Sequence, residues 1–229
     1  MSQVSDSETA AQVGREDAAA APSAPARRPT MLTWQGVGAS SLESVRLMAG
    51  GDRLRASGRL ISGGTGAHRG ALGAEAGDTG QAYSASFELS TDKAGRASRL
   101  LLRSTTAEDE RQVAVSRTQD GLWLVDRGQG AERAEFDGAL DVDVAGSVLF
   151  NGLPVRRLDL HRDAGDQELP VVRVSLPDLS VHLVRQRYRT VRVGENYSLI
   201  HFSCAGHTAD LTVDGDGMVL DFPGLARRV

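Results

Sequence analysis

The sequence predicts an all-β protein. From residue 31 onward, short runs of alternating apolar and polar residues are separated by clusters of Asp, Asn and Gly. These residues tolerate the positive φ angles that tight hairpin turns require. No segment after residue 31 keeps the helical apolar period over three turns, so we expect few and short helices. The turn clusters lie at 50–52, 92–95, 120–121, 137–138, 194–196 and 214–217.

The start of the chain predicts a disordered N-terminal tail. Residues 1–30 are rich in Ala, Ser, Pro and Gln and contain hardly any large apolar side chain. Such a segment buries too little surface to offset the entropy lost on ordering. The first apolar alternation follows at Leu32 and Trp34. We therefore expect a tail over 1–30 and one β domain over 31–229.

Within the domain, the alternation predicts a series of short strands. The best helix candidate is 40–47, and the Gly- and Ala-rich stretch 63–80 predicts a long hairpin loop. Examples of the predicted strands are 82–89, 98–104, 112–117, 122–126, 155–161, 171–176, 181–193, 198–204, 209–214 and 218–222.

The charge balance argues against a nucleic-acid partner. The formal net charge is −4, and the positive charge comes almost wholly from arginine, because Lys93 is the only lysine. A protein that binds a phosphate backbone is expected to be basic and to carry stacking aromatic residues. Here only 4% of the residues are Phe, Trp or Tyr.

Cysteine usage and the N-terminal region favour a cytoplasmic protein. Cys204 is the only cysteine, so an intrachain disulfide is excluded and a reducing compartment is the simpler interpretation. The first 30 residues carry several acidic side chains and no apolar run, which predicts neither secretion nor a membrane span. We expect a cytoplasmic protein without an integral membrane segment.

No motif points to a metal ion or a cofactor. His201, Cys204 and His207 have the side chains of a zinc site. On a strand over 198–204, however, His201 and Cys204 point to opposite faces, and His207 falls in the following turn. The glycine-rich run 63–70 matches neither of the two common nucleotide-binding loops. We therefore expect neither a metal nor a cofactor.

Asp141 and Asp143 are two residues apart in an alternating run, so on a strand they share a face. Paired carboxylates suit general acid-base catalysis. They also suit a solvated strand face, or pairing with Arg156 or Arg157 across a strand ladder. The chain has no G-x-S-x-G nucleophile motif. We expect no catalytic residues.

The segment 181–193 separates arginines from other polar residues. Arg185, Arg187 and Arg189 alternate with Gln186 and Tyr188, so the two groups lie on opposite faces of a strand. Arginines that lie along a sheet and reach water are one interpretation. The other is a concave apolar surface edged by guanidinium groups that bind a phosphate, a carboxylate or a sugar hydroxyl.

Several separated motifs resemble one protein family. They are Trp34 with 43–47 (ESVRL), 120–123 (DGLW), 138–158, 176–179 (LPDL) with 186–188 (QRY), and 213–225. Through them, residues 31–228 resemble the bacterial family described as "putative glycolipid-binding". The resemblance implies a strongly curved antiparallel sheet that forms an incomplete barrel, similar in shape to bacterial lipoprotein and lipid carriers. An apolar concavity of that kind can shelter an acyl chain.

The resemblance implies non-enzymatic binding of a lipid or glycolipid. Apolar groups in 147–151 stand where the family carries Thr and Pro. If this segment is a loop that contacts the ligand's head group, we expect either a different head-group preference or weaker polar recognition. One alternative is a structural or interaction module whose concavity is filled by its own side chains. The other is a hydrolase that acts on a lipid-like substrate through Asp141 or Asp143. The residues expected to contact the ligand are Asp141, Asp143, Asn151, Arg156, Arg157, Gln186 and Tyr188.

Overall fold

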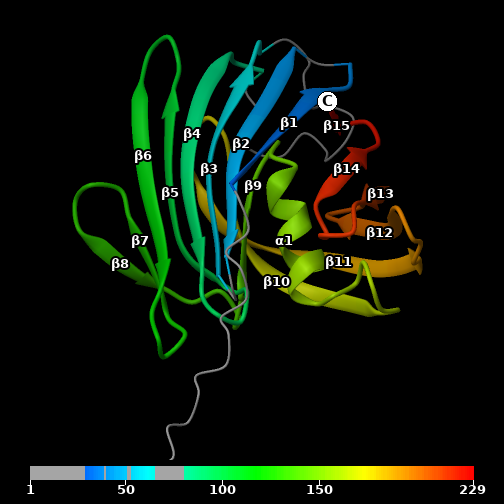
Figure 1. Cartoon of the computed structure of the whole chain (residues 1–229). Coiled ribbons are helices and arrows are strands. Elements are labelled where there is room, and N and C mark those ends of the chain that lie inside the picture. The colour runs from blue at the N-terminus through cyan, green and yellow to red at the C-terminus, as the bar shows by residue number, and fades with distance from the viewer. Residues whose placement is uncertain (1–28, 39, 51–52, 65–79) are drawn as a thin grey trace, which may run out of the picture.

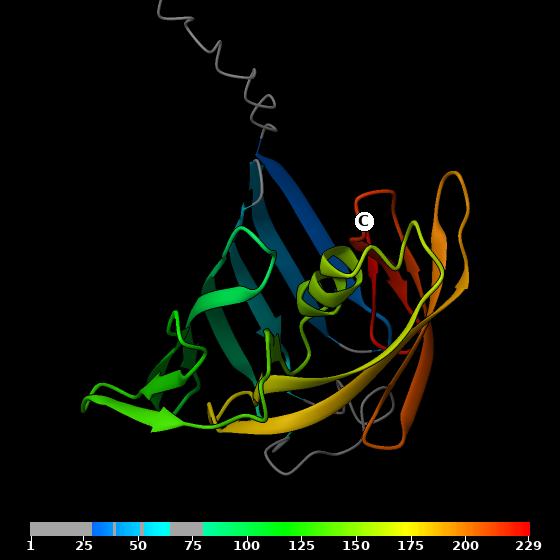
Figure 2. The same ribbon diagram turned by 90° about the horizontal axis from the view of Figure 1, so that it is seen from below.

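One curved sheet makes up most of the protein. The computed structural model describes residues 29–38, 40–50, 53–64 and 80–229, which contain fifteen strands and one α-helix. All fifteen strands belong to a single sheet that is not closed into a barrel. Figure 2 shows this sheet wrapped around the helix. The predicted all-β fold with a strongly curved sheet is confirmed.

The chain builds the sheet from two series of strands (Figure 1). The first series is β1 (Thr30–Gly36), β2 (Ser41–Gly50), β3 (Arg53–Ser62), β4 (Tyr83–Thr91), β5 (Ala97–Thr105), β6 (Glu110–Arg117), β7 (Trp123–Asp126) and β8 (Ala131–Ala134). The second is β9 (Asp141–Val144), α1 (Leu149–Arg157), β10 (Asp166–Val174), β11 (Val181–Arg192), β12 (Ser198–Cys204), β13 (His207–Val213), β14 (Val219–Phe222) and β15 (Ala226–Arg228).

The two series meet in the middle of the sheet. The strand order is β8-β7-β6-β5-β4-β3-β2-β1-β15-β14-β13-β12-β11-β10-β9. Hairpins connect the strands from β1 to β8 and again from β10 to β15, whereas β8 and β9 are the two edges of the sheet and α1 connects β9 to β10. The series join where β15 pairs with β1 through partners such as Trp34 and Arg228. Pairing is antiparallel except between β9 and β10, which are parallel. The backbone N–H of Ala97 also donates to the carbonyl of Leu140, which links the start of β5 to the segment before β9.

Alternation along the strands separates an inner face from an outer face. On β3, Leu54, Ala56 and Leu60 are buried, whereas Arg55 and Arg59 between them are exposed. The inner face carries the core, which includes both tryptophans. The indole N–H of Trp34 donates to the carbonyl of Val219 at 2.8 Å, so the central strands are also joined through a side chain.

Helix α1 fills the space inside the curved sheet. Every residue from Leu149 to Val155 is buried. The ring of Phe150 packs edge-on against Phe87 of β4, with the ring centroids 5.1 Å apart. Tyr188, Phe202 and Phe222 form a second row of ring contacts on the strands of the other series.

Three sequence predictions need correction. The predicted strand 155–161 is wrong, because Val155 lies in α1 and the segment continues into turns. The predicted helix 40–47 is wrong, because Ser41–Gly50 is strand β2, whose Glu43, Val45 and Leu47 face inward. The predicted loop 147–151 instead reaches into α1. Most of the predicted loop 63–80 and of the tail 1–30 lies outside the described residues.

Gly58 on β3 allows the aromatic contact beneath α1 to form. A Cβ atom at Gly58 would overlap the ring of Phe87 and lie 3.0 Å from Cγ2 of Val45. Because Phe87 is held by Phe150, its ring has little room to move. We expect Gly58→Ala to lower the free energy of unfolding by about 1–3 kcal/mol, as overpacked cores do. The measurement is equilibrium denaturation in urea.

Gly50→Ala is the matched control, because nothing lies within 4 Å of a Cβ built on Gly50. We expect that variant to retain wild-type stability. Equal stability of the two variants would show that the ring of Phe87 does not limit the size of residue 58.

Candidate functional site

Four of the predicted ligand-contacting residues form a hydrogen-bonded network inside the protein. The carboxylate of Asp143 accepts hydrogen bonds from Arg173 Nε at 2.8 Å and from the Gln186 side-chain amide at 2.7 Å. Tyr188 Oη donates to Gln186 Oε1 at 2.9 Å and accepts a bond from the Asn151 amide at 3.3 Å. All five side chains are buried. The network therefore joins β9, β10, β11 and α1 in the core.

Burial also affects the tyrosine of this network. Removal from water raises the pKa of Tyr188 well above 10.0, and the nearby charge of Asp143 raises it further. Tyr188 consequently stays a neutral hydroxyl that can donate to Gln186 at any physiological pH.

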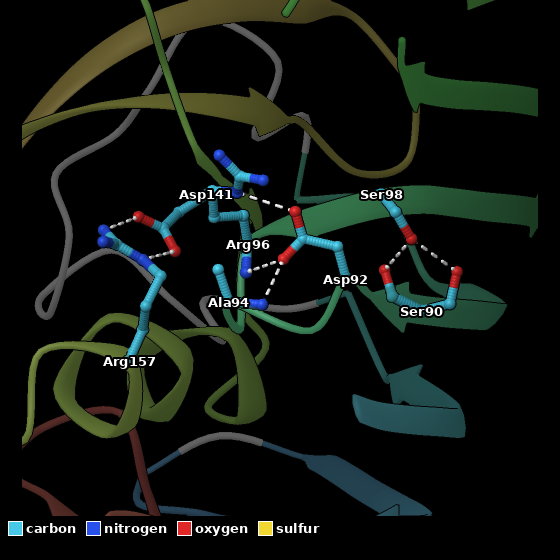
Figure 3. Close-up of polar contacts among 7 residues, drawn as sticks. All are labelled: Ser90, Asp92, Ala94, Arg96, Ser98, Asp141 and Arg157. Carbon is cyan, nitrogen blue, oxygen red and sulfur yellow. Dashed lines mark hydrogen bonds and ion pairs between the residues drawn. The ribbon is translucent and has the colours of Figure 1, made fainter. Parts of the chain in front are cut away.

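Asp141, which is buried, pairs with the partly buried Arg157 (Figure 3). Arg157 Nε and Nη2 donate to the two carboxylate oxygens of Asp141 at 3.1 and 2.5 Å. The pairing of this acid with Arg157 was one of the alternatives open from sequence, but the arginine comes from α1 rather than from a strand ladder. Figure 3 also shows the neighbouring turn, in which the Asp92 carboxylate accepts bonds from Ala94 and Arg96.

Arg156 is the one predicted residue that lies apart from these contacts. Its guanidinium donates to the carbonyl of Asp216 at 3.1 Å, in the turn between β13 and β14. The other six predicted residues form two groups, and all of them except the partly buried Arg157 are buried. Contact of any of the seven with a ligand stays a prediction.

Glu43 is a buried polar residue that the sequence analysis did not select. Its carboxylate accepts hydrogen bonds from Ser147 Oγ at 2.5 Å and from the backbone N–H of Val148 at 2.7 Å. It thereby caps the N-terminus of α1, where Val148 offers no side-chain cap. Burial raises the pKa of Glu43 from 4.5 to about 7, although these hydrogen bonds lower it. Its spacing of two and four residues from Val45 and Leu47, which places all three on one face of a strand, was the available sequence signal.

Arg173 was missed as well. It pairs with Asp143 across the parallel ladder between β9 and β10, and its guanidinium is almost fully buried, with 1% of the side chain exposed. An arginine within the apolar run 171–174 was the sequence signal for an internal ion pair.

The arginines of β11 point away from the core, which fits the first of the two interpretations, that they lie along the sheet and reach water. Arg185 pairs with Asp137, and Arg187 pairs with Asp166 at 2.7 Å on the exposed face. On β12, Cys204 is buried, whereas His201 is partly exposed and contacts Asp210 at 2.7 Å. His207 begins β13, so the prediction that it lies in a turn is wrong. Among the described residues, no group of His, Cys, Asp and Glu is arranged to hold a metal ion.

A groove lies on the outer face of β1–β5. It consists of two adjoining hollows of about 420 and 470 Å³, which share Ser57, Glu88 and Leu101. We call this surface the outer groove. Its polar and charged members are Ser44, Ser57, Ser86, Ser90, Arg46, Arg55, Arg59, Arg99, Arg103 and Glu88.

Strand register explains the composition of the outer groove. Arg59, Ser86 and Arg103 are direct cross-strand partners on β3, β4 and β5. Four residues along β4, Ser90 lies in the same way between Arg55 and Arg99. Small serines between long arginines leave the floor low and the sides raised, which creates the hollow.

Comparison with known proteins identifies the family. A family model described as "Putative glycolipid-binding" matches residues 31–228. The chain belongs to this family. A crystal structure of a DUF1089 family protein from Pseudomonas aeruginosa is similar, with a TM-score of 0.63 and 26% sequence identity over 82% of this chain and 92% of that one. No curated protein matches the chain.

For this member of the "Putative glycolipid-binding" family, the structure locates the segment 147–151 at the start of α1. Ser147 binds Glu43, and Val148, Leu149 and Phe150 are buried. The apolar groups there therefore serve the core. No helix in the described ranges is long and apolar enough to span a bilayer.

Proposed function

We propose that the protein binds a glycolipid without converting it, and that the ligand's sugar lies in the outer groove. Family membership supports the ligand class. The observation that carries the proposal is the lining of the groove, where serine hydroxyls and guanidinium groups adjoin Met31 and Leu101. Hydroxyls and guanidinium groups hydrogen-bond to sugar oxygens, and the apolar groups contact the less polar parts of the ligand.

An exposed apolar pair lies directly beside the groove. Leu42 and Ile61 are cross-strand partners on β2 and β3, with 43% and 52% of their surfaces exposed. They lie two residues along their strands from Ser44 and Arg59, which line the groove. A ligand whose sugar occupies the groove can therefore lay the start of its acyl chain over this pair.

The outer groove replaces the interior as the proposed ligand site because α1 fills the interior. Leu149 to Val155 and the aromatic side chains around them occupy the space that the sequence analysis assigned to an acyl chain. This filled interior also favours the second candidate, a structural or interaction module without a lipid ligand. A measurement of lipid binding distinguishes between these two candidate functions.

A tryptophan in the floor of the groove tests the proposal. Ser57 lines both hollows and is exposed, so we expect Ser57→Trp to fill them without disturbing the core. The expected result is a loss of about tenfold or more in affinity for phosphatidylcholine vesicles that contain glucosyl diacylglycerol, because the sugar is displaced. Co-sedimentation with vesicles measures this affinity.

Ser203→Trp is the control, because Ser203 lies beside Arg187 on the outer face of β12 and lines neither hollow. It should bind as the wild type does. Native mass spectrometry of the purified protein provides a second measurement. If no lipid co-purifies and none of several lipid classes binds on titration, glycolipid binding is wrong and the interaction module is favoured.

A further inference from the structure

The outer groove concentrates positive charge on a protein whose net charge is negative. Five arginines line its two hollows, and Glu88 is the one acidic residue among the lining side chains. In the part of the chain that the structure describes, no carboxylate lies within ion-pair distance of any of these five. The arginines at 185 and 187, on the outer face of β11, are paired with acids instead.

We propose that the outer groove recognises an acidic group on the ligand, so that the glycolipid bound is anionic. This inference rests on the proposed function and narrows it. Guanidinium groups bind carboxylate, phosphate and sulfate through charge-assisted, often bidentate hydrogen bonds. An uncharged sugar gives the same groups only neutral acceptors, which form weaker bonds.

The row formed by Arg59, Ser86 and Arg103 is the site assigned to the acidic group. Neighbouring strands are about 4.8 Å apart, so the backbones of the two arginines lie about 10 Å apart across Ser86. Two long side chains at that separation can converge on one anion above the serine, whose hydroxyl supplies a further donor. Arg46 lines the same hollow and adds a third positive charge.

The second row is less suited to an anion. Ser90 lies between Arg55 and Arg99, but its Oγ is 3.0 Å from Oγ of Ser98, with which it shares a hydrogen bond. Its hydroxyl is therefore already engaged within the protein. Glu88 lies between the two rows and repels an acidic group placed near it. The ligand's acidic group is thus directed to the row with Ser86.

The double variant Arg59→Gln/Arg103→Gln tests the inference on the intact chain. Its probes are phosphatidylcholine vesicles that contain either glucuronosyl diacylglycerol or glucosyl diacylglycerol, two glycolipids that differ by a carboxylate in the head group. The wild type should bind the glucuronosyl lipid at least about tenfold more tightly. The double variant should lose that preference, because its affinity for the glucuronosyl lipid should fall about tenfold further than its affinity for the glucosyl lipid.

Arg185→Gln/Arg187→Gln makes the same change of charge on the outer face of β11 and should keep the preference. Raised salt should weaken binding of the glucuronosyl lipid by the wild type, and affect the glucosyl lipid little. Free glucuronate, added as a competitor, tests whether the head group is recognised apart from the lipid. Release of the protein from glucuronosyl vesicles by free glucuronate supports the inference.

Two results would overturn the inference while glycolipid binding stands. One is equal affinity of the wild type for both glycolipids. The other is binding to phosphatidylglycerol vesicles as tight as to the glucuronosyl lipid, because the protein would then respond to surface charge without a sugar. Failure of the wild type to bind either glycolipid would overturn the proposed function itself.

Discussion

Replacing Arg173 with Met is expected to lower the free energy of unfolding by about 3–5 kcal/mol. The guanidinium of Arg173 contacts the Asp143 carboxylate at 2.8 Å, and 4% or less of either side chain is exposed. The substitution keeps most of the side-chain volume but leaves the carboxylate inside the core without its cation. The other side chain that donates to the Asp143 carboxylate, Gln186, is neutral. Denaturation in urea, followed by tryptophan fluorescence, measures the change.

Two further variants separate charge from packing. Arg187→Met removes an exposed partner of Asp166 and should leave stability almost unchanged, because water screens that pair. Adding Asp143→Leu to Arg173→Met should recover part of the lost stability, since no unpaired charge is then buried. If Arg173→Met alone were as stable as the wild type, burial of the Asp143 carboxylate would not depend on the charge of Arg173.

Glu43→Gln is expected to change how stability depends on pH. In the folded protein the pKa of Glu43 is about 7, against 4.5 for an exposed glutamate, so the folded state holds its proton more tightly. Glu43 therefore contributes most to stability below pH 4.5, and this contribution is lost as the pH rises through about 7. A shift of this size corresponds to about 3 kcal/mol. The glutamine variant should gain stability relative to the wild type by about that amount between pH 4.5 and 8.

Urea denaturation at a series of pH values measures this difference. Glu88→Gln is the matched control, because Glu88 is exposed on the outer face of β4, and its stability should follow that of the wild type at every pH. If the difference in the free energy of unfolding between Glu43→Gln and the wild type were constant from pH 4.5 to 8, Glu43 would not have a raised pKa in the folded protein.

The alternation in the sequence was sufficient to predict most strands and the faces of β11. Strand 198–204 was predicted with its observed bounds, and Gln186 and Tyr188 lie on the face opposite the arginines, as expected. Helix α1 was missed for a physical reason. Its residues from Leu149 to Val155 are buried on every side, so they show no apolar period, and Pro154 argues against a helix.

Features that depend on contacts between residues far apart in the chain could not be predicted from the sequence. Glu43 and Ser147 are 104 residues apart in the chain, and only the folded sheet shows that they meet. The outer groove likewise depends on the register of β3, β4 and β5. Strand β3 was not among the strands named from the sequence, although RLRASGRLIS alternates. Two of its inward-facing residues, Ala56 and Gly58, are small and give only a weak apolar signal.

The pairing of β1 with β15 sets the order in which the protein can be completed. These strands come from opposite ends of the described sequence, yet they lie side by side at the centre of the sheet. During synthesis, hairpins of the first series can form early, but β1 keeps one open edge until residues 226–228 have left the ribosome. Contacts so distant in sequence form slowly. The newly made chain therefore exposes an unpaired central strand that a chaperone or a second nascent chain can reach before folding is complete.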